Sequence, residues 1–315
     1  MAIEITITQK GGSRKALPFD VIIGDKLKYG RSDGTLLFKD IIGDNDFIAY
    51  NPNHIARGFS VKWKEGELYQ VRLRLTIPSH DEEIDDFYDT ARRIATYWKN
   101  CKIRQDNKVL SLEEDFVLQR SDAKVYSLQT LNDICTKTKF DKNNNMVTGD
   151  VDEESTPTCE GEIILHNAMW PIVLGGKEKA MLANSVDSTK FKEFLHEKQA
   201  INAYYAKAFY YEHPATKEFH AKFAIEEDTP SIFPLKPTVP WWLIDEKTGK
   251  LMEVDIWEIA LFSTTRDEML GEMLYADFIG KLKNTQYYDQ QNVLIQGVSL
   301  AEMEEMLEAG TSIVQ

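Results

Sequence analysis

The chain has 315 residues, 43% of them hydrophobic and 11% aromatic, which leaves room for two domains, or one large one, with ordinary cores. Its formal net charge of −14 argues against a nucleic-acid backbone or an anionic membrane as the main ligand, because phosphate binding needs a basic face. We therefore expect no nucleic-acid partner and no membrane partner, and consider another protein first.

The three cysteines, Cys101, Cys135 and Cys159, are odd in number and widely spaced, which fits neither a disulfide framework nor a zinc site. The N-terminus alternates like a strand and has no signal region, and no apolar run approaches the length of a membrane span. These features predict a cytoplasmic protein. The sequence holds no motif for a cofactor or a metal, so we expect neither.

The N-terminal part predicts a strand followed by a hairpin. Ile3, Ile5 and Ile7 alternate with polar residues, as in a half-buried strand. Two aromatic and β-branched stretches, 59–63 and 68–77, flank a polar loop that contains Gly66. This pattern is typical of a β-hairpin with one face buried.

A long amphipathic helix is expected next. Ser79 stands three residues before Glu82, which is the spacing of a capping box, and apolar residues from Ile84 to Trp98 follow at intervals of three and four. A second capping box is expected at Ser111 to Glu114. Residues 1–140 are therefore assigned to an N-terminal lobe.

Residues 141–157 are polar, acidic and poor in apolar side chains, which predicts a linker. Asp141, Asn143 and Asn145 are spaced as in a calcium-binding loop, but Met146 replaces the glycine that the loop requires at its sixth position. A solvated linker is the interpretation we favour.

Residues 158–315 are assigned to a C-terminal lobe. A hairpin is expected around residues 213–216, and from Pro240 the order of hairpin, capped helix, strand and capped helix resembles the order of the first lobe. The corresponding Asn100 and Asn284 lie 184 residues apart. The helices are expected to begin with capping boxes at Thr265–Glu268 and Ser299–Glu302. The pattern indicates an internal duplication, with a chance likeness of common units as the alternative.

These elements predict an α+β fold with two related lobes, each a mainly antiparallel sheet packed against capped amphipathic helices. Related lobes often meet along a cleft, and clefts bind ligands.

The candidate binding residues lie on two loops. Asn51, His54 and Arg57 precede the first hairpin, where polar side chains could bind an anion or take part in acid–base chemistry; solvated turn residues are the alternative. Trp241 and Trp242 are adjacent, so in a strand they face opposite sides: one is expected in the core and the other could form an aromatic platform, unless both are buried.

No nucleophile motif, metal-binding pair of histidines or phosphate loop is present, so no catalytic residue is assigned. A non-catalytic cytoplasmic binding or protein-interaction protein is the first hypothesis. The alternative is an enzyme acting on a small polar molecule at the cleft between the lobes, with His54 and Arg57 as its polar groups.

The run from Tyr50 to Phe59, followed by the hairpin and the helix, resembles an uncharacterised family of bacterial, mainly Gram-positive, proteins known as a domain of unknown function. The likeness extends to residues 298–303. The resemblance implies a soluble bacterial protein of unknown function, and it supplies no active-site or binding residues.

Overall fold

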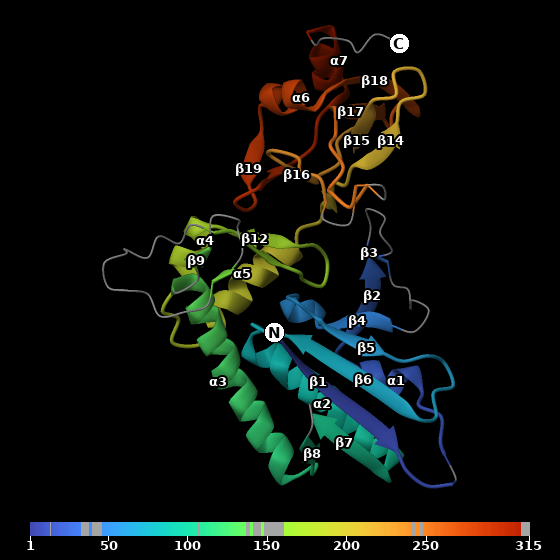
Figure 1. Ribbon diagram of the computed structural model, residues 1–315, viewed down its shortest axis with the longest axis vertical. Helices are drawn as coiled ribbons and strands as arrows, with labels where there is room; N and C mark the ends of the chain where they lie inside the picture. The colour runs from blue at the N-terminus through green and yellow to red at the C-terminus, as the bar shows by residue number, and fades with distance from the viewer. Residues whose placement is uncertain are drawn as a thin grey trace. The chain divides into compact units, whose positions relative to one another are not determined.

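The computed structural model describes residues 1–12, 14–32, 38–39, 46–105, 108–136, 139–140, 146–147, 161–240, 243–245 and 248–309. The chain divides into two compact units (Figure 1). The first contains residues 1–34 and 38–201, and the second contains residues 35–37 and 202–315. The mixed α+β class expected from the sequence is confirmed.

The first unit is built on an eight-stranded sheet in the order β3-β2-β4-β5-β6-β1-β7-β8, in which all neighbours are antiparallel. Its strands are β1 (Ala2–Gln9), β2 (Lys28–Ser32), β3 (Phe38–Lys39), β4 (Asp46–Tyr50), β5 (Phe59–Lys62), β6 (Gln70–Thr76), β7 (Cys101–Gln105) and β8 (Lys108–Leu110). The expected hairpin is β5–β6, with Gly66 at a φ of +77° in its loop.

Alternation along the strands decides which face of this sheet is buried. Ile3, Ile5 and Ile7 of β1 lie in the core, and their partners on β6 are also buried apolar residues. The residues between them point to the opposite face, because successive side chains of a strand alternate. That opposite face, which we call the outer face, is polar.

Helices pack against the apolar face. The first unit has α1 (Phe19–Ile23), the 3₁₀ turn η1 (Pro52–His54), α2 (Asp81–Trp98), α3 (Glu114–Thr136), α4 (Gly176–Leu182) and α5 (Thr189–Gln199). It also has two short ladders, β9 (Lys139–Phe140) with β10 (Met146–Val147) and β11 (Ile163–Leu165) with β12 (Ile172–Leu174). The expected stripe of α2 is confirmed, since its apolar residues from Ile84 to Trp98 are buried.

The capping of α2 differs from the expectation. Its N-cap is His80, whose Nδ1 accepts a hydrogen bond from the backbone N–H of Glu83. The hydroxyl of Ser79 donates instead to the carbonyl of Thr76, so the capping box expected at Ser79 is wrong. Because the hydroxyl of Ser79 is bound to Thr76 at the end of β6, His80 supplies the cap.

The division between the units lies at residues 201–202, whereas the sequence suggested a linker at 141–157. Residues 161–201 belong to the first unit because they hydrogen-bond to it at several points. The backbone N–H of Ala168 donates to the carbonyl of Ala56, and Asn132 of α3 exchanges two hydrogen bonds with the backbone of Ser185.

The second unit holds two four-stranded sheets, in the orders β14-β15-β17-β18 and β13-β16-β20-β19. The elements are β13 (Tyr204–Tyr205), β14 (Phe209–Glu212), β15 (Phe219–Glu226), β16 (Ser231–Pro234), β17 (Ile256–Ser263), β18 (Glu268–Leu274), α6 (Tyr275–Lys281), β19 (Thr285–Tyr287), β20 (Asn292–Ile295) and α7 (Leu300–Glu308). The hairpin expected around residues 213–216 is β14–β15. Aromatic residues, among them Phe223, Phe233 and Phe278, fill the core.

The start expected for a helix at Thr265 is wrong, because residues 268–274 form strand β18 and the helix, α6, begins only at Tyr275. The backbone N–H and the hydroxyl of Thr265 both donate to the carboxylate of Glu227, and Asp267 adopts a φ of +54°. This turn directs the chain back along β17, where pairing in the sheet replaces the helix. The element order of the first unit is therefore not repeated at this position.

The last helix agrees with the sequence. Ser299 caps α7 and Glu302 completes the capping box, with Val298 and Met303 buried beside it. Among the described residues, no helix is long and apolar enough to cross a membrane.

Candidate functional site

The first of the predicted binding residues lie on the turn between β4 and β5. Asn51 caps η1: its side-chain oxygen accepts a hydrogen bond of 3.1 Å from the backbone N–H of Asn53. Pro52 opens the turn, where its missing N–H costs nothing. His54 is therefore held at the end of a short, well-defined turn.

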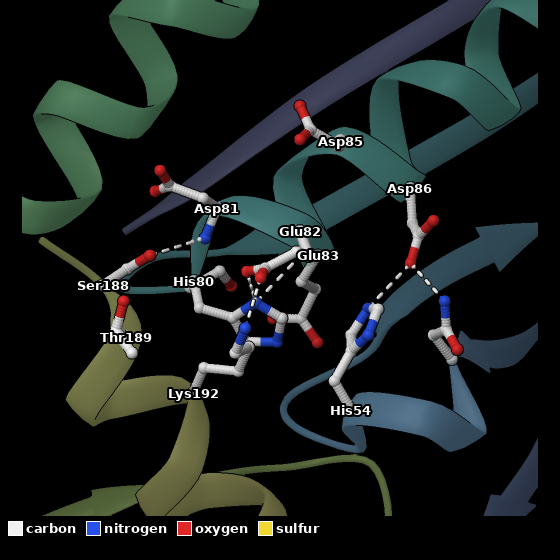
Figure 2. Close-up of polar contacts among 12 residues, drawn as sticks. His54, His80, Asp81, Glu82, Glu83, Asp85, Asp86, Ser188, Thr189 and Lys192 are labelled. Atoms are coloured by element: carbon white, nitrogen blue, oxygen red, sulfur yellow. Dashed lines mark hydrogen bonds and ion pairs between the residues drawn. The ribbon is translucent and has the colours of Figure 1, made fainter.

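His54 and Asn51 converge on one carboxylate of α2. The Nε2 of His54 lies 3.0 Å from Oδ2 of Asp86, and the side-chain amide of Asn51 donates to the same oxygen at 2.9 Å (Figure 2). Burial alone would raise the pKa of Asp86, but the hydrogen bonds from His54 and Asn51 and the charge of Lys26 outweigh burial and lower that pKa. Asp86 is thus an ionised acceptor, and the side chain of His54 is 19% exposed.

A second histidine packs against His54. The ring of His80 lies edge-on to that of His54, with the centroids 5.1 Å apart, and the side chain of His80 is fully buried. Its Nδ1 also lies 3.1 Å from Oε2 of Glu82. Two buried atoms, Nε2 of His80 and Oε2 of Glu83, have no hydrogen-bond partner. The interior of this cluster is therefore polar and incompletely paired.

Arg57 is brought near these residues but is not exposed on a loop. Its guanidinium donates to the carbonyls of His166 and Pro78, both at 3.2 Å, and the residue is 7% exposed. Burial lowers the pKa of Arg57 to about 10, while the neighbouring Glu83 favours its charged form. Burial and the charge of Arg57 also lower the pKa of His166. Arg57 therefore joins chain segments, and the expectation that it contacts a ligand has no support in this geometry.

Helix α5 contributes three residues that the sequence did not single out. Ser188 Oγ accepts a 3.0 Å hydrogen bond from the N–H of Asp81, and Lys192 pairs with Glu82 (Figure 2). Nδ1 of His196 accepts a 3.0 Å hydrogen bond from the N–H of Ile55. Residues four apart lie on one side of a helix, so the spacing of these three residues indicates in the sequence that they share one face. It did not show what the helix would contact.

The cluster adjoins a shallow depression of about 660 Å³ between α1 and α2. We call it the α1–α2 depression. Residues of both signs of charge contribute to its lining. Its residues are Val21, Asp25, Lys26, Asp86, Asp89, Arg92, Arg93, Thr96 and Tyr97.

Two of the charged residues of the depression are committed to other groups. Arg93 donates to the carbonyls of Val21, Ile22 and Ile23 at the end of α1, and Asp89 pairs with Arg120. The exposed groups that remain for a ligand are Asp25, Lys26 and Arg92, with Tyr97 half-buried beside them.

The chemistry open to the cluster is limited. A His–Asp pair can accept and pass a proton. In the described part of the chain, however, no Ser, Thr or Cys side chain hydrogen-bonds to His54, so a nucleophile–base pair is not formed there. No group of three or more His, Cys, Asp or Glu in the described residues is arranged to hold a metal ion.

The remaining candidates cannot be placed. Trp241 and Trp242 lie outside the described residues, as does most of the calcium-like stretch from Asp141 to Asp152. The structure thus brings together Asn51 and His54 and adds Asp86, His80 and α5 to them.

Comparison with known proteins gives a family and no activity. No curated protein and no solved structure matches the chain. The model of one family, described as "Domain of unknown function (DUF4299)", matches residues 2–306, which is nearly the whole chain. The protein therefore belongs to the DUF4299 family, as the run around Tyr50 to Phe59 suggested.

Proposed function

We propose that this DUF4299 chain is a non-catalytic cytoplasmic binding protein that takes a small charged molecule in the α1–α2 depression. The observation that supports it is the contrast between the two neighbouring regions. The side chains of Asn51, Arg57 and Glu82 hydrogen-bond within the chain itself, whereas Asp25, Lys26 and Arg92 are exposed around a depression of about 660 Å³.

The ligand would carry both signs of charge. Arg92 and Lys26 offer two cations, Asp25 offers a carboxylate, and Tyr97 supplies an aromatic ring. A zwitterion of the size of an amino acid or dipeptide fits these groups, because it pairs each charge without leaving one desolvated. His54 would then hold the carboxylate of Asp86 in place at the edge of the depression, and neither group would take part in a reaction.

The test is a thermal-shift screen of amino acids, dipeptides and polyamines with the whole chain. A ligand at about a hundred times its Kd should stabilise the folded state by about 2.7 kcal/mol and raise Tm. The Arg92→Ala variant should lose this shift, and Lys190→Ala, which removes an exposed cation of α5, should retain it. A shift that persists in both Arg92→Ala and Lys26→Ala would exclude the depression.

The second candidate is an enzyme acting on a small polar molecule, with His54 as general base. It is favoured by one observation: His54 is partly exposed and paired with an ionised Asp86. If it is correct, His54→Gln should bind the ligand found in the screen but abolish its turnover. Undiminished turnover in this variant would exclude His54 as the base.

A further inference from the structure

The outer face of the eight-stranded sheet carries an unexpected row of cations. Cross-strand register aligns Lys62 of β5 with Arg72 of β6, Arg72 with Thr6 of β1, and Thr6 with Arg104 of β7. Neighbouring strands are about 4.8 Å apart, so the row crosses four strands in about 15 Å. Further cations flank the row on the same face, namely Arg74 and Lys102.

These cations are nearly unpaired. Arg72 Nε lies 3.3 Å from Glu4 Oε1, and both side chains are substantially exposed. In the part of the chain that the structure describes, Lys62, Lys64 and Arg104 make no ion pair and no side-chain hydrogen bond. The chain has 51 acidic and 37 basic residues, so acidic partners are abundant elsewhere. On this face Glu4 lies beside Arg72, and Asp46 of β4 stands opposite Lys62 in the register. The five cations of the face outnumber these two acids, which leaves a locally positive surface in an acidic protein.

The row ends at a depression beside the β5–β6 hairpin, which we call the hairpin depression. Its volume is about 600 Å³, within the range of small-molecule sites. Three of its lining residues are cations, and an amide and two aromatic residues stand beside them. The lining residues are Lys62, Trp63, Lys64, Gly66, Glu67, Leu68, Tyr69, Gln70 and Arg72.

Glu67, the one acidic residue of the lining, already accepts hydrogen bonds from the backbone of the loop. Oε1 of Glu67 accepts hydrogen bonds from the backbone N–H groups of Tyr69 and Gln70, at 2.6 and 3.0 Å. These bonds shape the loop and direct part of the negative charge of Glu67 toward the backbone. The lining therefore sets three cations against one carboxylate.

Tyr69 adds a platform for a planar group. Its side chain is 57% exposed, and the guanidinium of Arg14 lies 4.1 Å from its ring centroid. Arg14 thus brings a fourth cation to the rim. An aromatic ring beside several cations can stack on a planar group while the cations bind charge.

We propose that the hairpin depression binds a small, multiply charged phosphate compound. Three cations line a space too small for a macromolecule, Arg14 stacks on the neighbouring Tyr69, and the planar fork of Arg72 matches the oxygens of a phosphate group. The rest of the row, through Arg104, steers anions toward the site. This site lies on the face of the sheet opposite the helices and is separate from the α1–α2 depression.

The test is calorimetric titration of the whole chain with ATP and with inorganic tripolyphosphate at low salt. We expect both to bind, with Lys62→Ala, Lys64→Ala and Arg72→Ala each weakening binding about tenfold or more, as expected for a lost charge-assisted hydrogen bond. Tyr69→Ala distinguishes a ligand with a planar group, such as a nucleotide, from a simple polyphosphate. It should weaken ATP alone if a planar group stacks on Tyr69, and neither probe if the phosphates are the whole ligand.

Two controls make the result decisive. Arg104→Ala removes a cation of the same face that does not line the depression, and should weaken binding less than Arg72→Ala does. Lys190→Ala on α5 should change nothing. The five cations replaced in these variants are all exposed, so each variant should keep the Tm of the unmodified chain, and this comparison verifies that it folds.

The proposal is overturned if neither probe binds. It is also overturned if Arg104→Ala weakens binding as much as Arg72→Ala and affinity rises with the length of a single-stranded oligonucleotide. That second result would show a diffuse surface for a polyanion in place of a small-molecule site.

Discussion

Gly58 lies where the turn carrying His54 enters β5, and its backbone is fixed from two sides. Its N–H donates a 2.6 Å hydrogen bond to Oε1 of the buried Glu83, and its φ is +66°. A Cβ at this position would lie 2.5 Å from Cγ2 of Ile48 and 3.0 Å from the carbonyl oxygen of Ala49. Gly58 is therefore required both by conformation and by space.

The Gly58→Ala variant should lower the free energy of unfolding by about 3 kcal/mol, because it combines left-handed strain with a clash against Ile48 and the backbone. Chemical denaturation monitored by circular dichroism measures the change. The matched control is Gly66→Ala, which has a φ of +77° but open space around the new Cβ, and should cost about 1 kcal/mol. Equal losses in the two variants would show that the clash is relieved without cost.

The limits of residue-level prediction are clear in the His54 cluster. Turn chemistry around Pro52 identified Asn51 and His54, because an Asn–Pro turn is a local property. Their shared partner, Asp86, is one of two adjacent carboxylates, and nothing in the sequence distinguishes it from Asp85. The choice depends on which side of α2 faces the turn, which the fold decides.

At the scale of elements, α5 docks on the N-terminus of α2 through charged and polar side chains. Burial alone would raise the pKa of Glu82. The hydrogen bond from Lys192, a hydrogen bond from the backbone and the interaction with His80 outweigh it and lower that pKa to about 2. Since Glu82 binds its proton less readily in the folded state, the folded state is favoured while Glu82 is ionised.

This contribution should be fully present above a pH of about 4.5, the ordinary value for Glu, and should disappear as the pH falls toward 2. Glu82→Gln should therefore reduce stability at neutral pH and remove part of the acid dependence between these values. The effect should stay below about 1 kcal/mol, because both side chains are partly exposed. Denaturation curves at pH 6, 4 and 3 measure it.

Glu193→Gln provides the control, because Glu193 is an exposed carboxylate of α5 without an ion pair in the described residues. Its acid dependence should match that of the unmodified chain. If Glu82→Gln also matches the unmodified chain at every pH, the pair with Lys192 does not stabilise the folded state.

Helices were predicted correctly where neighbouring residues determine them, and incorrectly where hydrogen bonding between distant strands determines the structure. The stripe of α2 and the capping box of α7 are read within a few residues, and both are confirmed. The stretch after Thr265 has apolar residues at helical spacing, yet it pairs with β17. Hydrogen bonds to Glu227, far away in sequence, replaced the helix cap that Thr265 suggested.

At the scale of the molecule, the first unit extends well past the acidic stretch. Residues 161–201 supply Ser188, Lys192 and His196 to the N-terminus of α2 and the turn before β5, and the carbonyl of His166 to Arg57. A fragment ending at residue 140 would lose the carbonyl that accepts from Arg57 and the lysine that pairs with Glu82, and loss of the partner of a charged group is costly.

A fragment of residues 1–201 should therefore unfold cooperatively, and a fragment of residues 1–140 should be less stable by several kcal/mol or fail to fold. Thermal unfolding followed by circular dichroism compares the two. Equal Tm values for both fragments would place the boundary at the acidic stretch after all. Fragment 202–315 gives the corresponding measurement for the second unit.

The sequence alone determined the α+β class, the β5–β6 hairpin, the helix from Asp81 to Trp98 and the cap at Ser299. Each depends on periodicity or turn chemistry, which act within a few residues of the chain. The tertiary structure alone decided that His80 and Arg57 are buried, that α5 belongs with the first unit, and that Lys62, Arg72 and Arg104 form one row. Burial of polar groups and alignment across strands depend on residues far apart in the chain, and their spacing in sequence does not encode which of them will meet.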